Sequence, residues 1–367
     1  MILMNDFNAE PDEIKQEMIL AAERVIQSGW YVLGTEVESF ETSWASICGT
    51  KHAIGVGNGM DAIEIALRAL GIGKGDEVIT TSMTAYATVL AILRSGAIPV
   101  IADINKKDAL IDLESAKRCV SKKTKAVVLV HLYGQLKNMD SWIDFCRSER
   151  IYLIEDCAQA HLATIDNKMA GSFGEVGAYS FYPTKNLGAL GDAGALVTND
   201  SDLAEKITQL RNYGQKDRYH HIQQGLNSRL DEIQAALLSV RIRWLKEFTK
   251  KRQMIAKNYH DNMMCNNIHC LEKPEKKESH TYHQFVITCI NRAKLEIHLK
   301  NFGVQSLIHY PVPIHLQKAN SYTFRRDPKG LHNAERHAQT CISLPINPQM
   351  TISDQNKVID SINAFKL

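Results

Sequence analysis

From residue 51 to about residue 200, short apolar runs alternate with segments in which apolar residues recur every three or four positions. This alternation is typical of a mostly parallel sheet covered by helices. Seven runs have the length and composition of strands: Ala53–Val56, Val78–Thr81, Pro99–Ala102, Ala126–Val130, Ile151–Ile154, Ala178–Phe181 and Ala195–Thr198. The pattern predicts an α/β domain with a mostly parallel, seven-stranded sheet flanked by helices.

Helical patterns surround these runs. Residues 11–29 read as an amphipathic helix ended by Gly29, and Asp61–Leu70 carries an apolar stripe with an acid in its first turn. A longer pattern, from Glu232 to about Tyr259, contains neither glycine nor proline. We expect this last segment to connect two parts of the molecule.

The C-terminal part has a different pattern. A charged loop at residues 272–279 precedes a strand at Gln284–Ile290 and helices at Arg292–Asn301 and Leu331–Ile342. These elements predict a smaller α+β domain. We therefore expect a large domain over residues 1–240, including the N-terminal helix, and a small domain over residues 241–367.

Composition narrows the class of protein. Lys plus Arg number 43 against 41 Asp plus Glu, a net charge of +2, so neither nucleic acid nor an anionic membrane is an expected partner. No apolar run approaches the ~18–20 residues needed to span a bilayer, and no export signal follows Met1. The eight cysteines are scattered, which favours a reducing compartment. We expect a soluble cytoplasmic protein.

Two residues suggest a specific chemistry. Asp156 ends the apolar run that begins at Ile151, and Lys185 follows another predicted strand and Pro183. Ligands bind at the carboxyl ends of strands in open α/β sheets. A lysine amine can bond to the aldehyde of pyridoxal phosphate while a carboxylate keeps the ring nitrogen protonated. Taken alone, Asp156 could instead cap a helix, and Lys185 could be a surface lysine.

The turn Gly55-Val-Gly-Asn-Gly-Met-Asp joins a predicted strand to a predicted helix. Glycines let the backbone approach a ligand closely, and free amides at a helix start suit a phosphate. The spacing matches neither a nucleotide P-loop nor the dinucleotide pattern. A purely structural turn is the alternative.

Two histidine-containing segments are ambiguous. The stretch His309-Tyr-Pro-Val-Pro-Ile-His is a proline-stiffened aromatic loop, and His220 and His221 follow Tyr219. A metal site would need further ligands at defined spacing, and none is evident, so we expect no metal. A loop that contacts substrate is the favoured interpretation, with a structural turn as the alternative.

Taken together, the segments resemble the DegT-type sugar aminotransferases, which are fold-type-I pyridoxal phosphate enzymes. The resemblance runs from about residue 34 to residue 345. It rests on motifs that occur in order along the chain: Gly57-Asn-Gly-Met-Asp-Ala, His131-Leu-Tyr-Gly-Gln, Glu155-Asp-Cys-Ala-Gln-Ala-His, Ser180-Phe-Tyr-Pro-Thr-Lys-Asn-Leu-Gly, Gly225-Leu-Asn-Ser-Arg and Ile308-His-Tyr-Pro-Val-Pro.

The resemblance implies a role for each matching position. Lys185 would bind the cofactor covalently and then carry protons, as the catalytic residue. The implied cofactor-binding residues are Asp156 for the ring nitrogen, Gln159 for the phenolic oxygen, Gly59, Met60 and Ser180 for the phosphate, and Asn227 for the phosphate of a neighbouring subunit. His309, Tyr310 and His221 would lie near a nucleotide-sugar. Sites shared across a two-fold axis would make a homodimer the active unit.

One position departs from the family pattern. Relatives place an aromatic residue over the cofactor ring directly after a threonine, where this chain has Ala85, and the aromatic residue is Tyr86. Tyr86 is therefore the candidate for covering the ring. Relatives that dehydrate or deoxygenate sugars carry histidine at the lysine position, so Lys185 favours amino transfer.

The form of the glycine turn resembles members that act on 3-keto sugars. The implied reaction takes an amino group from L-glutamate to a dTDP-3-keto-6-deoxyhexose and gives a dTDP-3-amino-3,6-dideoxyhexose, for example for a lipopolysaccharide O-antigen or another glycoside. Amination at C4 is the alternative, and gluco or galacto configuration stays open. A non-catalytic regulator that keeps the fold is the alternative from a different class.

Overall fold

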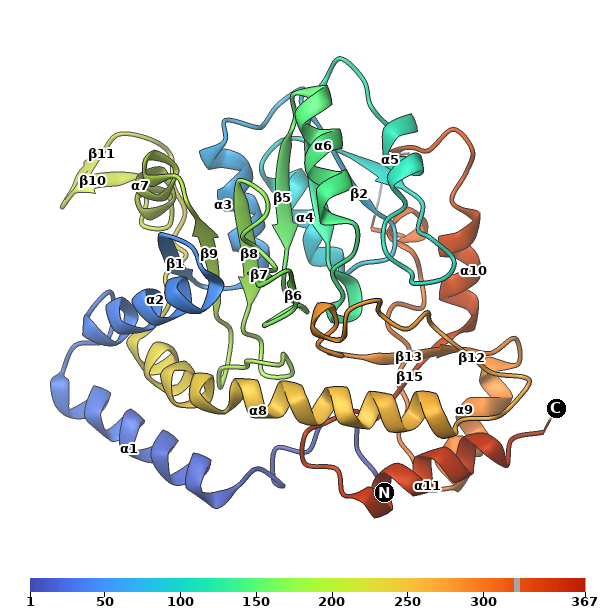
Figure 1. The fold of residues 1–367 in the computed structure, drawn as a ribbon. Helices are drawn as coiled ribbons and strands as arrows, with labels where there is room; N and C mark the ends of the chain where they lie inside the picture. Colours follow the sequence, from blue (N-terminus) through green and yellow to red (C-terminus); the bar gives the residue numbers. More distant parts are fainter. Residues whose placement is uncertain (320–323, 367) are drawn as a thin grey trace.

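The computed structural model describes residues 1–319 and 324–366. Within these residues, eight strands form a sheet with helices on both faces (Figure 1). In spatial order the strands are β1 (His52–Val56), β9 (Gly194–Thr198), β8 (Val176–Ser180), β5 (Tyr152–Asp156), β4 (Thr124–Val130), β2 (Glu77–Thr81), β3 (Ile98–Ala102) and β14 (Arg325–Arg326). Only β9 runs antiparallel to its neighbours. All seven predicted strands are present, and β14 is an eighth that the sequence did not indicate.

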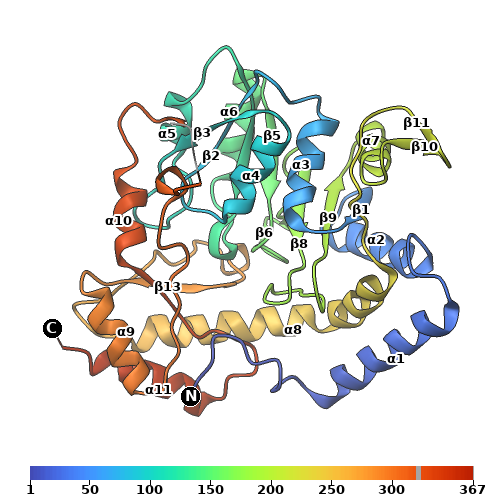
Figure 2. The same ribbon diagram turned by 180° about the vertical axis from the view of Figure 1, so that it is seen from behind.

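The helices cover the two faces of the sheet as separate layers. One layer contains α2 (Thr35–Cys48), α5 (Leu113–Arg118) and α6 (Met139–Glu149), and the other contains α3 (Gly59–Ala69), α4 (Tyr86–Arg94) and α7 (Ser201–Leu210). Figure 2 shows α3 and α4 on the face opposite α6. Val127 and Leu129 of β4 pack toward the first layer, and Ala126 and Val128 toward the second. Burial on both faces explains the continuous apolar runs in the sequence.

Two long helices lie below the sheet in Figure 1, α1 (Asp12–Ser28) and α8 (Glu232–Asn262). They pack together through Ile14 and Met18 of α1 and Leu237 of α8. α1 ends at Gly29, whose φ of 67° is the left-handed conformation that glycine adopts without strain. The sequence predicted both helices. α8 continues unbroken past residue 240, so the proposed domain boundary there stays a prediction.

The C-terminal elements form a second, smaller sheet with its own helices. Its strands are β12 (His269–Cys270), β13 (Phe285–Thr288) and β15 (Cys341–Leu344), and its helices are α9 (Arg292–Asn301), α10 (His332–Thr340) and α11 (Ile352–Asn363). The predicted helix at Leu331–Ile342 is therefore too long. Its last two residues belong to β15, because Cys341 and Ile342 pair with β13 in an antiparallel ladder.

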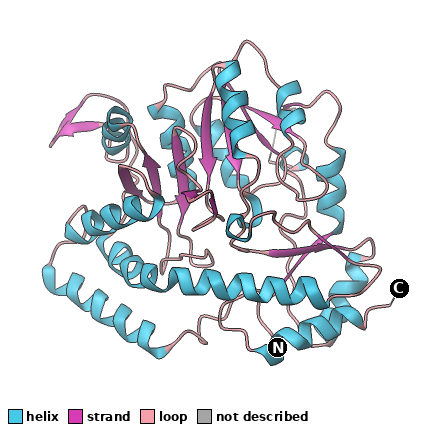
Figure 3. Cartoon of the chain, in the orientation of Figure 1, coloured by secondary structure: helices cyan, strands magenta, loops and turns pink. Residues whose placement is uncertain are grey.

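Short elements complete the chain (Figure 3). They are two hairpins, β6 (Thr164–Ile165) with β7 (Lys168–Met169) and β10 (Gln215–Asp217) with β11 (His220–His221), and three 3₁₀ turns, Leu132–Gly134, Lys277–Ser279 and Ile314–Leu316. Among the described residues, no helix combines the length and apolar character needed to cross a membrane.

Candidate active site

Asp156 is the last residue of β5, and its side chain is buried. The Thr88 hydroxyl donates to Oδ2 of Asp156 at 2.9 Å, and the backbone N–H of Ala158 donates to Oδ1 at 3.2 Å. Burial raises the pKa of the carboxyl group, whereas these two hydrogen bonds and the charges of Lys185 and His131 lower it. The hydrogen bonds therefore support the ionised form against the effect of burial.

Lys185 lies in the loop between β8 and β9, in a turn closed by a 2.8 Å hydrogen bond from its N–H to the carbonyl of Tyr182. Burial lowers the pKa of its amine to about 8, and the Asp156 carboxylate opposes this shift. A lysine with a lowered pKa is neutral more often near pH 7 and so is a better nucleophile. Each group shifts the pKa of the other, so the structure brings Asp156 and Lys185 together, as predicted.

The start of α3 meets the end of β8. Asn58 caps the helix by accepting the N–H of Asp61 at 2.8 Å, so the amides of Gly59 and Met60 lie in the first turn, at the positive end of the helix dipole. A Cβ on Gly59 would lie 2.5 Å from the Cβ of Ser180. Glycine at position 59 therefore allows the helix start to lie directly beside Ser180. These three predicted residues form one surface.

Gln159 contacts the loop that contains His309 and Tyr310. Its Oε1 accepts the N–H of Tyr133 at 2.6 Å, and its Nε2 donates to the Tyr310 hydroxyl at 3.0 Å. His309 bonds to the Ser343 hydroxyl at 2.8 Å. Burial, with the charge of Lys185 as a second cause, lowers the pKa of His309 to about 4, so the ring is neutral at pH 7. The structure thus places Gln159, His309 and Tyr310 close to Lys185 and Asp156.

The position of Tyr86 differs from that of the other predicted site residues. It is the first residue of α4, and its ring packs with an apolar cluster that includes Val89, Ile101 and Phe324. Thr88, two positions further along, points toward Asp156. Residues two apart on a helix do not share a face, so the Tyr86 ring lies on a different side of α4 from the Asp156 contact. A role for Tyr86 in covering a cofactor stays a prediction.

Two further predicted residues lie on the surface of the single chain. His221 is exposed in the β10–β11 hairpin, which extends from the body of the molecule at the left of Figure 1. Asn227 is also exposed, although its neighbour Ser228 is buried and accepts the N–H of Gly57 at 3.0 Å. The chain alone does not bring His221 and Asn227 to Lys185.

Sequence reasoning missed three buried residues of the site: Thr88, His161 and His283. His161 bonds to the carbonyl of Ser180 at 3.0 Å, and His283 bonds to Asn186 at 3.2 Å. The Lys185 charge contributes to lowering the pKa of both histidines. Thr88 could have been noticed as the residue four positions after Thr84, with which it shares a 2.8 Å hydrogen bond. Its contact with Asp156 depends on how α4 packs on the sheet.

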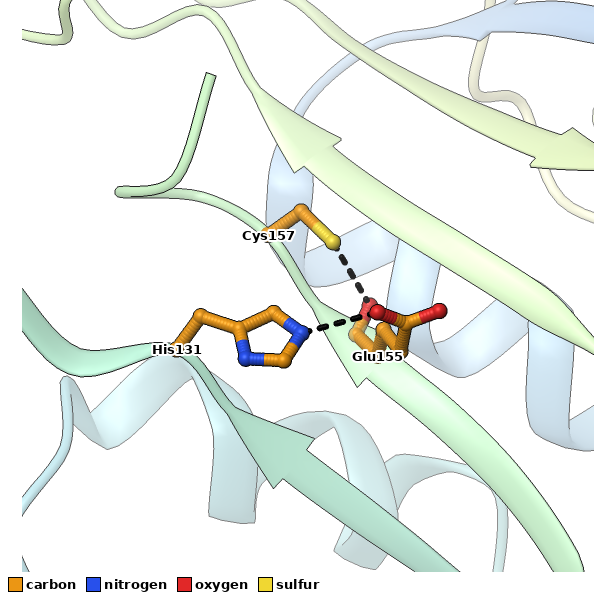
Figure 4. A group of neighbouring side chains, drawn as sticks. All are labelled: His131, Glu155 and Cys157. Atoms are coloured by element: carbon orange, nitrogen blue, oxygen red, sulfur yellow. Dashed lines mark hydrogen bonds and ion pairs between the residues drawn. The ribbon is translucent and has the colours of Figure 1, made fainter. Parts of the chain in front are cut away.

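One other buried cluster, His131, Glu155 and Cys157, has ligand types that could hold a metal (Figure 4). The Glu155 carboxylate accepts four hydrogen bonds, from His131 at 2.8 Å and from the N–H groups of Gly171, Phe173 and Gly174. A carboxylate has about four acceptor positions, so these donors leave none for an ion. Through the hydrogen bonds of Glu155, the cluster stabilises the loop at residues 171–174 beside the site.

The donor set of this site fits pyridoxal phosphate. A lysine amine with a lowered pKa suits the aldehyde, a buried carboxylate suits a protonated ring nitrogen, and the amides at the start of α3 suit the phosphate. A side chain on residue 59 would clash with Ser180, so glycine there lets the first turn of α3 and Ser180 lie together where a phosphate could contact both.

Comparison with known proteins agrees with this chemistry. Residues 12–363 match the DegT/DnrJ/EryC1/StrS aminotransferase family. The chain is 41% identical to a dTDP-3-amino-3,6-dideoxy-alpha-D-galactopyranose transaminase of Aneurinibacillus thermoaerophilus, covering 96% of each chain. It is 39% identical to a dTDP-3-amino-3,4,6-trideoxy-alpha-D-glucose transaminase of Streptomyces venezuelae, over 98% of this chain and 95% of the relative.

A solved structure shows the same fold. The crystal structure of S. venezuelae DesV in complex with a ketimine intermediate superposes with a TM-score of 0.94 at 39% identity, covering 99% of this chain and 97% of DesV. The family, the fold class and the cofactor predicted from the sequence are thereby confirmed. The chain belongs to the DegT/DnrJ/EryC1/StrS aminotransferase family and is a pyridoxal phosphate-dependent aminotransferase.

Proposed function

We propose that this protein transfers the amino group of L-glutamate to the 3-keto carbon of a dTDP-6-deoxyhexose and so forms a dTDP-3-amino-3,6-dideoxyhexose. The observation that carries this proposal is the pairing of Lys185 with Asp156 in a chain whose relatives include two dTDP-3-amino-sugar transaminases. Product sugars of this kind enter surface polysaccharides such as O-antigens, or glycosides, and we place the enzyme in the cytoplasm.

Residues of the described site would contact the cofactor at its aldehyde, at its ring and at its phosphate. Lys185 would bond to its aldehyde and Asp156 to its ring nitrogen, while Gln159 would reach the phenolic oxygen. Gly59, Met60 and Ser180 would bind the phosphate, as their common surface suggests. When bound, the cofactor accepts the electron pair that is left when a proton leaves the carbon bearing nitrogen.

The side chains then have separate tasks. The Lys185 amine, with its pKa lowered to about 8, takes the proton from the donor's α-carbon and returns one in the second half of the reaction. The Asp156 carboxylate, which accepts hydrogen bonds from Thr88 and Ala158, would hold the ring nitrogen in its protonated form. Tyr310 contacts Gln159, and His309 is close enough to Lys185 to feel its charge, so the two residues would orient the keto-sugar.

The exposed residues support a shared active site. Tyr219 is 76% exposed at the tip of the β10–β11 hairpin, and His221 and Asn227 are exposed on and beside it. In a two-fold dimer, this surface would complete the site of the other subunit, with Asn227 at the phosphate and His221 near the nucleotide-sugar. The large domain at residues 1–240 would then carry most of the interface, and residues 241–367 would close the site from the opposite side.

The product decides which carbon is aminated. The enzyme would be incubated with L-glutamate and either the dTDP-3-keto or the dTDP-4-keto sugar, and each product would be analysed by NMR. Nitrogen on C3 supports the proposal. A product formed only from the 4-keto sugar would replace it with 4-amination, and no amino sugar from either substrate would favour a different substrate or a regulatory role.

A mixture of two inactive variants tests the shared site. Lys185→Ala and Asn227→Ala would be purified separately, mixed and allowed to exchange subunits. In a mixed dimer one site has both defects and the other has neither, so roughly a quarter of all sites should regain activity. Two Lys185→Ala proteins mixed in the same way serve as the control. No recovery in a mixture shown to contain mixed dimers would contradict the shared site.

A further inference from the structure

A buried tyrosine lies between Gln159 and the loop that contains His309 and Tyr310. Tyr133 is the central residue of the 3₁₀ turn Leu132–Gly134, which follows β4, and it is 2% exposed. Its φ of 61° is a left-handed conformation that residues with a side chain rarely adopt. Such a conformation persists where surrounding contacts fix it, and it is common at functional sites. We therefore expect the contacts of this residue to matter for the site beside it.

Hydrogen bonds join Tyr133, Gln159, Tyr310 and His309 in a closed ring. The Tyr133 N–H donates to Oε1 of Gln159 at 2.6 Å, and Nε2 of Gln159 donates to the Tyr310 hydroxyl at 3.0 Å. The Tyr133 hydroxyl donates to the carbonyl of His309, the residue before Tyr310, at 3.1 Å. One tyrosine therefore fixes Gln159 through its backbone and the His309–Tyr310 dipeptide through its hydroxyl.

His337 of α10 supports this hydroxyl from the C-terminal part of the chain. Its Nε2 lies 3.0 Å from the Tyr133 hydroxyl oxygen. The single hydroxyl hydrogen goes to the His309 carbonyl, so His337 must be the donor in this contact. Burial lowers the pKa of His337 to about 4 and raises the pKa of Tyr133 well above its ordinary value, so both side chains are neutral at pH 7. The donors therefore run in sequence from His337 through Tyr133 to the His309 carbonyl.

The Tyr133 ring also packs with the elements that these bonds connect. It belongs to an apolar cluster that includes Val130 of β4 and Ala334 and Ala338 of α10, and Tyr310 is partly buried against this cluster. Figure 1 shows α10 at the right of the large sheet. A phenylalanine at position 133 would keep this packing and lose the hydroxyl alone.

We propose that Tyr133 and His337 are positioning residues for the keto-sugar. They act through the His309–Tyr310 dipeptide, which they hold at its backbone carbonyl. This inference rests on the proposed function, in which the side chains of His309 and Tyr310 orient the sugar, and it adds the residues that fix them. Groups that contact a substrate orient it best when they are fixed beforehand. The bond to Gln159 comes from a backbone N–H, so loss of the Tyr133 hydroxyl should affect the sugar and spare the amino donor.

The two half-reactions test this role. In Tyr133→Phe, the keto-sugar concentration that half-saturates the second half-reaction should rise about tenfold, because the loop loses one hydrogen bond. The rate and the half-saturating glutamate concentration of the first half-reaction should stay unchanged. His337→Leu should show the same pattern to a smaller extent, and His337→Gln, which keeps a donor, should retain most of the affinity for the sugar.

A double variant and a control make the test specific. When Tyr133→Phe is already present, His337→Leu should add little, because both residues act on one carbonyl. Tyr259→Phe is the matched control. The Tyr259 hydroxyl is also buried and donates to a backbone carbonyl, that of Pro345, at 2.8 Å, so its loss should leave both half-reactions unchanged.

Hydrogen exchange tests the loop without any substrate. In the cofactor-loaded enzyme, peptides that cover residues 306–316 should exchange faster in Tyr133→Phe than in the unaltered protein or in Tyr259→Phe. The two His337 variants carry the same test should Tyr133→Phe not fold. Unchanged exchange, or a loss shared equally by both half-reactions, overturns the positioning role.

The same measurements separate this inference from the proposed function. An unaltered enzyme that takes nitrogen from glutamate but gives none to either keto-sugar contradicts the proposed function. The exchange rates then still decide whether Tyr133 and His337 hold the His309–Tyr310 dipeptide in place.

Discussion

The Asp156 carboxylate and the Lys185 amine of this site differ in how firmly the structure holds them. Asp156 ends a central strand, and hydrogen bonds from Thr88 and Ala158 fix both of its oxygens. Lys185 lies in a loop, and within the described residues no hydrogen bond or ion pair holds its amine. The difference suits the two tasks: a charge that stabilises a transition state works best when it is fixed beforehand, whereas a group that carries protons must move.

The largest expected effect on the rate of amino transfer comes from removing the Lys185 amine. Lys185→Ala should lower the rate of amino transfer at least about a thousandfold, because both the covalent bond and the proton carrier are lost. Borohydride reduction followed by peptide mass spectrometry should place the cofactor on residue 185 of the unaltered enzyme only. Lys185→Arg, which keeps a charge but is no nucleophile at neutral pH, is the matched control and should be equally inactive. Turnover that survives in Lys185→Ala would remove the basis of the proposed mechanism.

Removing the fixed charge should have the next largest effect. Asp156→Asn keeps the shape of the side chain but no longer favours a protonated ring nitrogen, so the rate should fall about a hundredfold to a thousandfold. The binding of pyridoxal phosphate would be compared with that of its analogue in which carbon replaces the ring nitrogen. The unaltered protein should prefer the natural cofactor, and Asp156→Asn should show little preference. An unchanged preference would place Asp156 away from the ring nitrogen.

Thr88 should matter less, and through Asp156 alone. Thr88→Val removes a hydrogen bond that lowers the pKa of Asp156, so that pKa should rise and the acid limb of the rate profile should move to higher pH. The loss in rate at neutral pH should be about tenfold or less. Thr88→Ser keeps the hydroxyl and should restore both properties. A pH profile that is identical in all three proteins would show that Thr88 only packs.

The smallest effect concerns stability without cofactor. The pKa of Lys185 is about 8 in the folded protein against its ordinary value of 10.5, so between these values the unfolded state binds the proton and the folded state does not. Stability should therefore rise with pH from about 8 to about 10.5, relative to Lys185→Met, and the two proteins should differ by a constant amount below pH 8. Urea unfolding across this range measures the difference, and a flat difference would mean that the amine is not desolvated.

Much of the site could be predicted because its residues follow strands. Asp156 comes directly after an apolar run, and Lys185 comes soon after another, so their approach follows from neighbouring strands, β5 and β8, ending at the same edge of the sheet. Thr88, His283 and Arg252 could not be predicted in this way. Each belongs to a different element, and its partner is reached only when a helix or the C-terminal part packs against that edge.

The local pattern of the sequence determined the seven predicted strands, the helix ended by Gly29 and the motifs of the family, because each depends on neighbouring residues. Packing alone decided that Cys341 and Ile342 pair with β13 rather than extend α10, and that Arg252 of α8 lines the same small cavity as Lys185. Both outcomes depend on contacts between segments that are far apart in the sequence. The pattern of neighbouring residues does not reveal the energies of such contacts.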